Sequence, residues 1–273
     1  MITLATDFGN PYPAAMRGVI LRRTDARLVD VAHDFPRQDV RTAAFWLREV
    51  LPHFPPAVHC AVVDPGVGTG RRALVVRAGD HALVGPDNGL LLPAARRLAG
   101  DGADGRGDGD DEADEDDATG APAPGIEAFA WRADDPASST FHGRDVFAPA
   151  AAAVHEAGVE AIGELDRATP VDEVVDLRFP APDRRDDGAD GEVLVVDGFG
   201  NVITNVPGDA LDGRDAVRVN GEPYPVAPSY AHRDPGDALV MVGSHGNVEL
   251  AVNRGRGDEA FGVGVGDAVS LRF

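Results

Sequence analysis

The chain has 273 residues, with 46 acidic and 25 basic side chains and a formal net charge of −21. All of the basic side chains are arginine, since the sequence contains no lysine. This acidity disfavours nucleic acid or an anionic membrane as a partner, because phosphate groups would be repelled. It is typical of a halophilic protein, whose carboxylate surface stays hydrated while salt screens its self-repulsion.

The single cysteine and the first residues carry no sequence signal of secretion. Cys60 adjoins an apolar run and cannot form an internal disulfide, which predicts a small core residue. Residues 1–10 enter a strand pattern without a basic segment, so no signal peptide is predicted, and no apolar run is long enough to span a bilayer. We therefore expect a cytoplasmic protein that has no membrane partner.

Residues 1–165 alternate between strand-like and helical patterns. The strand-like runs are residues 2–8, 26–32, 57–64, 72–79 and 81–89; helical spacing occurs over 14–24 and 40–54, and residues 139–158 have the pattern of a loop that enters a helix. This alternation predicts an α/β domain with a largely parallel sheet. Ligands bind at the carboxyl ends of strands in such sheets, and Asp7, Asp64 and Asp87 each end a strand-like run or closely follow one.

The second half of the chain changes character. Residues 101–124 form an insertion rich in Asp, Gly and Pro, for which we expect a disordered acidic loop without chemistry. Residues 166–190 are rich in Pro, Asp and Arg and are predicted to be a linker. From residue 191 to 273, short strands alternate with Gly, Pro, Asn and Asp, which predicts a small all-β domain, a barrel.

Two common ligand sites can be weighed on the residues alone. The glycines of GVGTG, residues 66–70, lead into a strand-like run rather than a helix, and no Walker lysine is present, so we reject a phosphate-binding loop. A metal hydrolase stays open as a minor alternative, because the chain offers hard and nitrogen ligands. These are Asp7, His33, Asp34, Asp64, Asp87 and His142, none of which forms a ligand pair on one helix.

Three residues attract attention only in combination. In isolation Asp64 reads as a turn acid, Arg71 as a surface base and His142 as a helix cap. Their significance comes from seven stretches that occur together and in order. These are DFG (7–9), VDVAHDFPRQDV (29–40), VVDPGVGTGR (62–71), GPDNGLL (85–91), TFHGRDVFAPAAA (140–152), DGFGNVITN (197–205) and GSHGNVELAVN (243–253).

Together these stretches resemble the S-adenosyl-L-methionine (SAM) hydroxide adenosyltransferases, the adenosine-forming SAM hydrolases, which are similar to the SAM-dependent fluorinase and chlorinase. The resemblance implies an α/β domain, a C-terminal β-barrel and a homotrimer with active sites between subunits. It also implies displacement at the ribose C5′ of SAM by water, which releases L-methionine and forms adenosine. SAM is then the substrate, and no cofactor or metal is expected.

The resemblance assigns the water site to Asp64, Arg71 and His142. Arg71 would stabilise developing hydroxide, while the other two orient the water and accept its proton. Neighbouring Arg72 fits the acid-to-arginine spacing of the family less well. The sulfonium leaves as a neutral thioether, so its departure needs no general acid.

The resemblance also assigns substrate contacts to residues that would otherwise be read as turn or core positions. Asp7 would accept the ribose hydroxyls. Asp197 would pair with the methionine ammonium and Ser244 would donate to the carboxylate. The adenine would lie between aromatic rings, with its edge read by an amide and by backbone atoms. The residues implied for adenine are Phe199, Tyr230, Asn201 and Arg254.

Departures from the halogenases favour water as the nucleophile. Asp64 stands where those enzymes carry a tyrosine, and His142-Gly143 stand where they carry Tyr-Ser. A carboxylate beside the nucleophile repels halide, by about 4 kcal/mol at 4 Å and an effective dielectric of 20. His245 replaces an arginine of the fluorinase, which leaves the carboxylate contact open. A SAM-dependent halogenase and a non-catalytic SAM or adenosine binder remain the alternatives.

Overall fold

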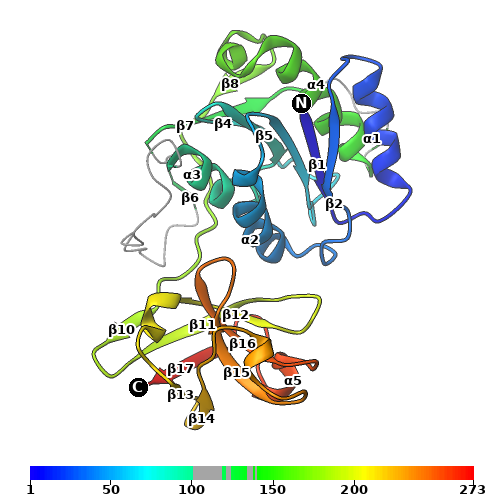
Figure 1. Cartoon of the computed structure of the whole chain (residues 1–273). Helices are drawn as coiled ribbons and strands as arrows, with labels where there is room; N and C mark the ends of the chain where they lie inside the picture. The colour runs from blue at the N-terminus through cyan, green and yellow to red at the C-terminus, as the bar shows by residue number, and fades with distance from the viewer. Residues whose placement is uncertain (101–118, 121–123, 134–137, 139) are drawn as a thin grey trace. The chain divides into compact units, whose positions relative to one another are not determined.

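The structure is a computed structural model that describes residues 1–100, 119–120, 124–133, 138 and 140–273. The chain divides into two compact units, one ending at Leu177 and the other running from Arg178 to Phe273 (Figure 1).

The change of unit falls within the predicted linker 166–190. In this segment β8 (Ala168–Pro170) and β9 (Val174–Val175) belong to the first unit. The predicted acidic insertion 101–124 lies mostly outside the described residues. Its Thr119–Gly120 form strand β6, which pairs with β9.

The first unit is built on a seven-stranded sheet in the order β2-β1-β3-β5-β4-β7-β8. The pairings β2–β1, β1–β3 and β3–β5 are parallel, as expected from the alternation of strands and helices, and the predicted α/β class is confirmed. The strands are β1 (Ile2–Thr6), β2 (Leu28–Ala32), β3 (Val58–Val62), β4 (Ala73–Ala78), β5 (His81–Pro86) and β7 (Ile126–Trp131).

The other edge of this sheet is antiparallel. β4 pairs antiparallel with β5 and β7, and β7 pairs antiparallel with β8. The reason is local, because only Gly79 and Asp80 separate β4 from β5. A two-residue connection closes a hairpin and cannot make a parallel crossover, and Gly79 adopts the positive φ of 56° that such turns require.

The helices of the first unit pack in two pairs. Figure 1 shows α1 beside α4 on one side of the sheet and α2 beside α3 on the other. α2 begins after Asp39, whose carboxylate accepts a hydrogen bond from the Thr42 N–H at 2.9 Å. The helices are α1 (Tyr12–Leu21), α2 (Val40–Val50), α3 (Leu92–Gly100) and α4 (Ala148–Ala157), with short 3₁₀ helices at Leu51–His53 and Val159–Glu164.

The second unit is an all-β barrel, as predicted. Its strands follow the order β14-β13-β17-β11-β12-β16-β15, and β10 also pairs with β11. The two ends of this sheet meet where Val226 bridges Val240 and the Ala227 N–H donates to the Val240 carbonyl at 3.0 Å. Valine and leucine side chains fill the interior.

The elements of the second unit are short, in keeping with the frequent turn residues of this part of the sequence. They are β10 (Asp183–Arg185), β11 (Gly188–Val196), β12 (Val202–Pro207), β13 (Ala216–Val219), β14 (Glu222–Pro225), β15 (Ala238–Val242), β16 (Asn247–Val252), β17 (Ala268–Arg272), α5 (Gly257–Phe261) and 3₁₀ turns at Gly208–Leu211 and Tyr230–His232.

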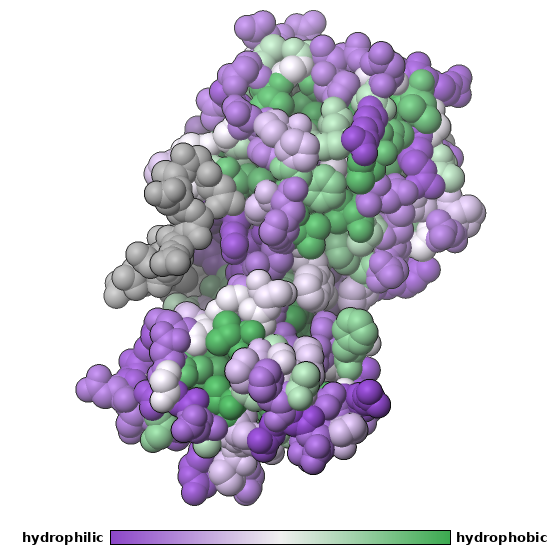
Figure 2. Space-filling model, viewed as in Figure 1, coloured by the Kyte–Doolittle hydropathy of each residue, from purple (hydrophilic) through white to green (hydrophobic). Residues whose placement is uncertain are grey.

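The surface carries the polar character of the sequence. Figure 2 shows hydrophilic side chains across the visible face of both units, interspersed with apolar ones. Among the described residues, no helix combines the length and apolar character needed to cross a bilayer.

Candidate active site

Asp64 follows β3 and is held at two points. Its side chain is 7% exposed, and its Oδ1 forms an ion pair with the Arg71 guanidinium and accepts a hydrogen bond from the Gly66 N–H at 3.1 Å. The guanidinium lies so close to Gly66 that a Cβ at this position would overlap it. The glycine-rich turn therefore serves to bring the arginine over the backbone and onto the acid.

The neighbouring GPDNG stretch supports this turn. The Asn88 side chain donates to the carbonyl of Val63, the residue before Asp64, at 2.9 Å. Asn88 also accepts from the Leu90 N–H at 3.2 Å, which fixes its own orientation. Two of the motifs found in the sequence thus meet at the carboxyl end of β3.

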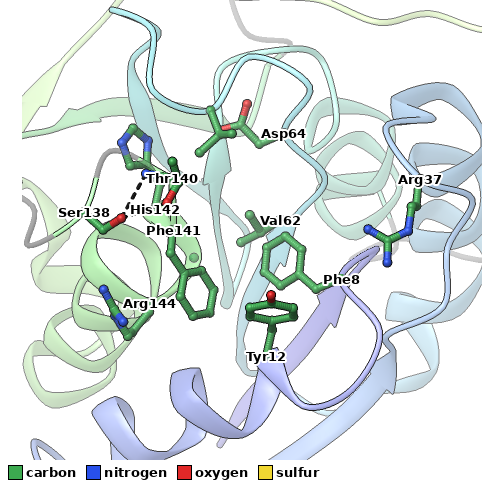
Figure 3. Close-up of a pocket in the computed structure, with 12 residues that line it drawn as sticks. Phe8, Tyr12, Arg37, Val62, Asp64, Ser138, Thr140, Phe141, His142 and Arg144 are labelled. Carbon is green, nitrogen blue, oxygen red and sulfur yellow. Dashed lines mark hydrogen bonds between the residues drawn. The ribbon is translucent and has the colours of Figure 1, made fainter.

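Asp64 and His142 line one cavity of about 510 Å³ in the first unit. Figure 3 shows both residues at the upper end of this cavity, with aromatic rings below them. Arg71 does not line the cavity, but reaches it through Asp64. The lining comprises Phe8, Tyr12, Arg37, Val62, Asp64, Val67, Ser138, Thr140, Phe141, His142, Gly143 and Arg144.

His142 stands immediately before an irregular helical turn. Gly143–Phe147 form a π-helix, which leads directly into α4. Gly143 packs tightly, since a Cβ there would lie 2.8 Å from the Phe8 ring and 3.2 Å from the Met16 sulfur. A serine at position 143 therefore has no room unless Phe8 moves.

An aromatic wall, which the sequence analysis missed, completes the cavity. Phe141 meets Phe8 edge-to-face at 5.8 Å and Tyr12 at 5.5 Å between ring centroids. Arg144 pairs with Asp145 through two hydrogen bonds, and its guanidinium lies 5.1 Å from the centroid of the Phe141 ring. Phe8 and Phe141 adjoin Asp7 and His142 in the motifs, which is the signal that could have identified them.

Asp7 lies at the carboxyl end of β1, as predicted, and is buried. Its Oδ2 accepts a hydrogen bond from the Gln38 N–H at 2.7 Å, and Gln38 adopts a positive φ of 62°. Asp7 does not line the cavity, but its neighbour Phe8 does, and so does Arg37 next to Gln38. The loop after β2 is thereby tied to the end of β1.

The residues weighed as metal ligands are engaged in separate pairs. His33 contacts Thr6 Oγ1 and Asp30, both at 3.0 Å. Asp87 accepts from Arg72 and from the Val175 N–H, each at 2.8 Å, and so connects the end of β5 to β9. Over the part of the chain that the structure describes, no three His, Cys, Asp or Glu side chains are grouped closely enough to hold a metal ion.

The second unit brings Asp197, Asn201 and Tyr230 together. Asp197 opens the turn between β11 and β12, and its Oδ1 accepts from the Phe199 and Asn201 N–H groups at 2.8 Å. The Asn201 amide nitrogen donates to Asp197 Oδ2 at 2.9 Å and to the Tyr230 hydroxyl at 3.0 Å. Phe199 projects from this turn with 81% of its surface exposed.

Ser244 and Arg254 occupy other turns of the barrel. Ser244 is exposed in the turn between β15 and β16, while Arg254 is exposed after β16 with a positive φ of 58°. Tyr230 donates to Glu249 at 2.6 Å. Burial, together with this hydrogen bond, raises the pKa of Tyr230 well above its ordinary value, so the phenol keeps its proton. Glu249 is not among the site residues predicted from the sequence, although an acid within the apolar run NVELAV is itself a signal.

Asp64, paired with Arg71, and His142 meet at one cavity where the parallel strand β3 ends, and the chain continues into a β-barrel. This arrangement is typical of an enzyme of two domains. The chain belongs to the SAM hydroxide adenosyltransferase family. The family's N-terminal domain matches residues 2–163 and its C-terminal domain matches residues 191–270.

Individual relatives cover nearly the whole chain. The (R)-S-adenosyl-L-methionine hydrolase of Salinispora tropica is 41% identical over 99% of this chain and 97% of its own length. The protein of the same name from Thermus thermophilus is 40% identical, with 97% of each chain covered. Among solved structures, an uncharacterized conserved protein from Thermotoga maritima superimposes over 100% of both chains, with a TM-score of 0.80 and 30% identity.

Proposed function

We propose that this protein hydrolyses SAM to adenosine and L-methionine by attack of water at the ribose C5′. The observation that carries the proposal is the cavity where His142 and the Asp64–Arg71 pair meet. Membership of the family and the names of its relatives, (R)-S-adenosyl-L-methionine hydrolases, supply the substrate.

The chemistry needs one oriented water and an acceptor for its proton. Asp64 Oδ1 is occupied by Arg71 and Gly66, so Oδ2 is the atom that accepts a hydrogen bond from the attacking water. His142 accepts the proton that the water loses, and the charge of Arg71, which reaches the cavity through Asp64, stabilises the developing hydroxide. The new C5′–O bond forms as the C5′–S bond breaks. The electron pair of the C5′–S bond stays on sulfur, which leaves as the neutral thioether of methionine.

The remaining contacts follow the family assignment. Asp7 accepts the ribose hydroxyls, Asp197 pairs with the methionine ammonium and Ser244 donates to the carboxylate. The adenine site comprises Phe199, Tyr230, Asn201 and Arg254. The exposed Phe199 is consistent with a ring that becomes covered only when a ligand binds.

The assembly and setting of the enzyme are also part of this proposal. We infer a homotrimer in which the first unit of one subunit and the barrel of its neighbour share each site, working without metal or cofactor in a salt-rich cytoplasm. The charge of −21 per chain supports salt dependence, since the screening length grows from about 8 Å at 0.15 M salt to about 30 Å at 0.01 M. Light scattering across a salt series should find a trimer at high salt that loosens as salt is removed.

The central test is an isotope experiment. The purified protein is incubated with SAM in ¹⁸O-water, with and without molar chloride, and the nucleoside is identified by mass spectrometry. We expect adenosine carrying one ¹⁸O under both conditions, at a rate that EDTA does not change. The (R)- and (S)-epimers of SAM are assayed separately. Chlorinated nucleoside as the main product would establish a halogenase, and binding of SAM without turnover would establish a binder.

A further inference from the structure

The barrel contains one carboxylate whose burial demands an explanation. Glu249 lies on β16 and is 6% exposed, and no arginine neutralises it among the contacts that the structure gives. Its Oε1 accepts a hydrogen bond from the Tyr230 hydroxyl at 2.6 Å, and its Oε2 faces the His245 ring nitrogen Nε2 at 3.4 Å. A buried carboxylate is costly unless its partners are well placed, and here each oxygen is directed at a different segment.

The contact of Glu249 Oε1 with Tyr230 fixes the adenine side of the proposed site. The Tyr230 hydroxyl donates to Glu249 and accepts from the Asn201 amide at 3.0 Å. The same amide nitrogen donates to Asp197 at 2.9 Å, so both of its hydrogens are committed and the orientation of the amide is determined. The phenol ring and the amide are therefore held by one chain of hydrogen bonds that ends on Glu249.

The contact of Glu249 Oε2 with His245 fixes the turn that carries Ser244. The Asn247 N–H donates to His245 Nδ1 at 3.3 Å, so the ring proton resides on Nε2, which is the nitrogen that faces Glu249. A Cβ on Gly243 would lie 2.5 Å from this ring and 2.6 Å from Glu249 Oε2. Position 243 must be glycine for the His245 ring to pack against the backbone of this turn. Ser244, the next residue, stays exposed.

We propose that Glu249 is a positioning residue that organises both ends of the substrate site in the barrel. One carboxylate sets the Tyr230–Asn201 side and the Ser244 turn at the same time. His245 then serves as an anchor between Glu249 and the turn, rather than as a replacement for a substrate-binding arginine. The identity of the ligand rests on the proposed function, whereas the hydrogen-bonded geometry does not.

The test separates positioning from a general loss of stability. Glu249→Gln keeps the size of the side chain but loses its charge and one of its two acceptor oxygens, so the hydrogen bond from Tyr230 and the contact with His245 cannot both be kept. We expect the dissociation constant for adenosine, measured by calorimetry, and the KM for SAM to rise about tenfold, while kcat stays within about threefold. Glu222→Gln, the same change at an exposed position on β14 of the barrel, should leave all three values unchanged.

A double-mutant cycle identifies the path. Tyr230→Phe removes the same hydrogen bond while the carboxylate stays, so it should weaken adenosine binding on its own. Combined with Glu249→Gln, it should weaken binding by less than the product of the two separate effects. The proposal is overturned if the effects of the two variants on the dissociation constant for adenosine multiply fully, or if Glu249→Gln binds adenosine as tightly as wild type.

Two further outcomes are also decisive. Should Glu249→Gln not fold, unchanged adenosine binding in Tyr230→Phe alone overturns the proposal, and weakened binding at unchanged kcat supports it. If the wild-type protein binds adenosine but does not turn over SAM, the proposed hydrolysis is wrong. The binding measurements would still decide the role of Glu249.

Discussion

The strand β3 connects two polar clusters of opposite character. Within the strand, His59 is 1% exposed and is bonded to Thr3 Oγ1 at 2.8 Å and to the His81 ring at 2.9 Å. Just beyond the strand, Asp64 pairs with Arg71 and faces a cavity. The first cluster is closed, because its partners come from the neighbouring strands β1 and β5. The second is open to a ligand, because the chain has left the sheet.

The two clusters also differ in charge. Burial, with a smaller contribution from His81, lowers the pKa of His59 to about 3, so its ring is neutral at physiological pH. The other cluster holds an ion pair next to a space large enough for a small molecule. We therefore expect that disturbing the open cluster lowers turnover, whereas disturbing the closed cluster lowers stability.

The largest expected effect is on turnover in Arg71→Ala. Loss of the guanidinium leaves Asp64 without its ion pair and the developing hydroxide without its stabilising charge, so kcat should fall by about 10²–10³. Adenosine formation measured by chromatography gives the rate. Arg72→Ala is the matched control, because this neighbouring arginine pairs with Asp87 and contacts the Glu173 carbonyl instead. A larger loss of kcat in Arg72→Ala would reverse the assignment of the two arginines.

His142→Ala should lower kcat by about 10² while SAM still binds, because the side chain lines the nucleophile end of the cavity. The same rate assay, paired with calorimetry for SAM, separates turnover from binding. His53→Ala serves as the control, since this histidine is exposed after α2 and is not part of the cavity lining. Wild-type turnover in His142→Ala would remove the residue from the mechanism.

Gly66→Ala tests the open cluster without replacing either charged side chain. The new methyl group would overlap the Arg71 guanidinium and push it away from Asp64, so kcat should fall by about tenfold to a hundredfold. Gly70→Ala, in the same turn, meets no atom within 4 Å and should retain wild-type rates. Equal rates in the two variants would mean that the Asp64–Arg71 contact does not limit turnover.

The local patterns of the sequence predicted the α/β class and the barrel. The family resemblance, not the local patterns, implied a common site for Asp64 and His142, which line the same cavity. The two-residue Gly79-Asp80 connection also predicts the antiparallel pairing of β4 with β5. The alternation of strand and helix patterns instead favoured a parallel sheet. Contacts between distant residues could not be predicted in this way. The π-helix after His142 and the wall of Phe8 and Phe141 depend on how separate elements pack.

The structure also changes the argument about halide. Treated as an isolated anion, Asp64 was expected to repel halide strongly, but its ion pair with Arg71 makes the two together close to neutral. Selection of water then depends more on the hydrogen bond that Asp64 can accept, which a halide cannot donate. The absence of a hydroxyl at Gly143, where Phe8 fills the space, acts in the same direction.

The smallest expected effect concerns stability at acid pH and tests the closed cluster. The pKa of His59 is about 3 in the folded protein and 6.5 in the unfolded chain, so between these values the unfolded chain binds more protons. Stability is therefore fully present above pH 6.5 and is lost as the pH falls, by about 2 kcal/mol between pH 7 and pH 5 from this residue. Urea unfolding at the two pH values measures the loss.

His59→Gln should be less stable at pH 7, because it cannot reproduce both ring contacts, but should lose about 2 kcal/mol less than wild type on acidification. His53→Gln, at an exposed position, should keep the wild-type dependence on pH. If His59→Gln showed the full wild-type loss at pH 5, the titrating group would lie elsewhere and the closed cluster would not set acid stability. An unchanged kcat in folded His59→Gln at pH 7 would complete the contrast with Arg71 and His142.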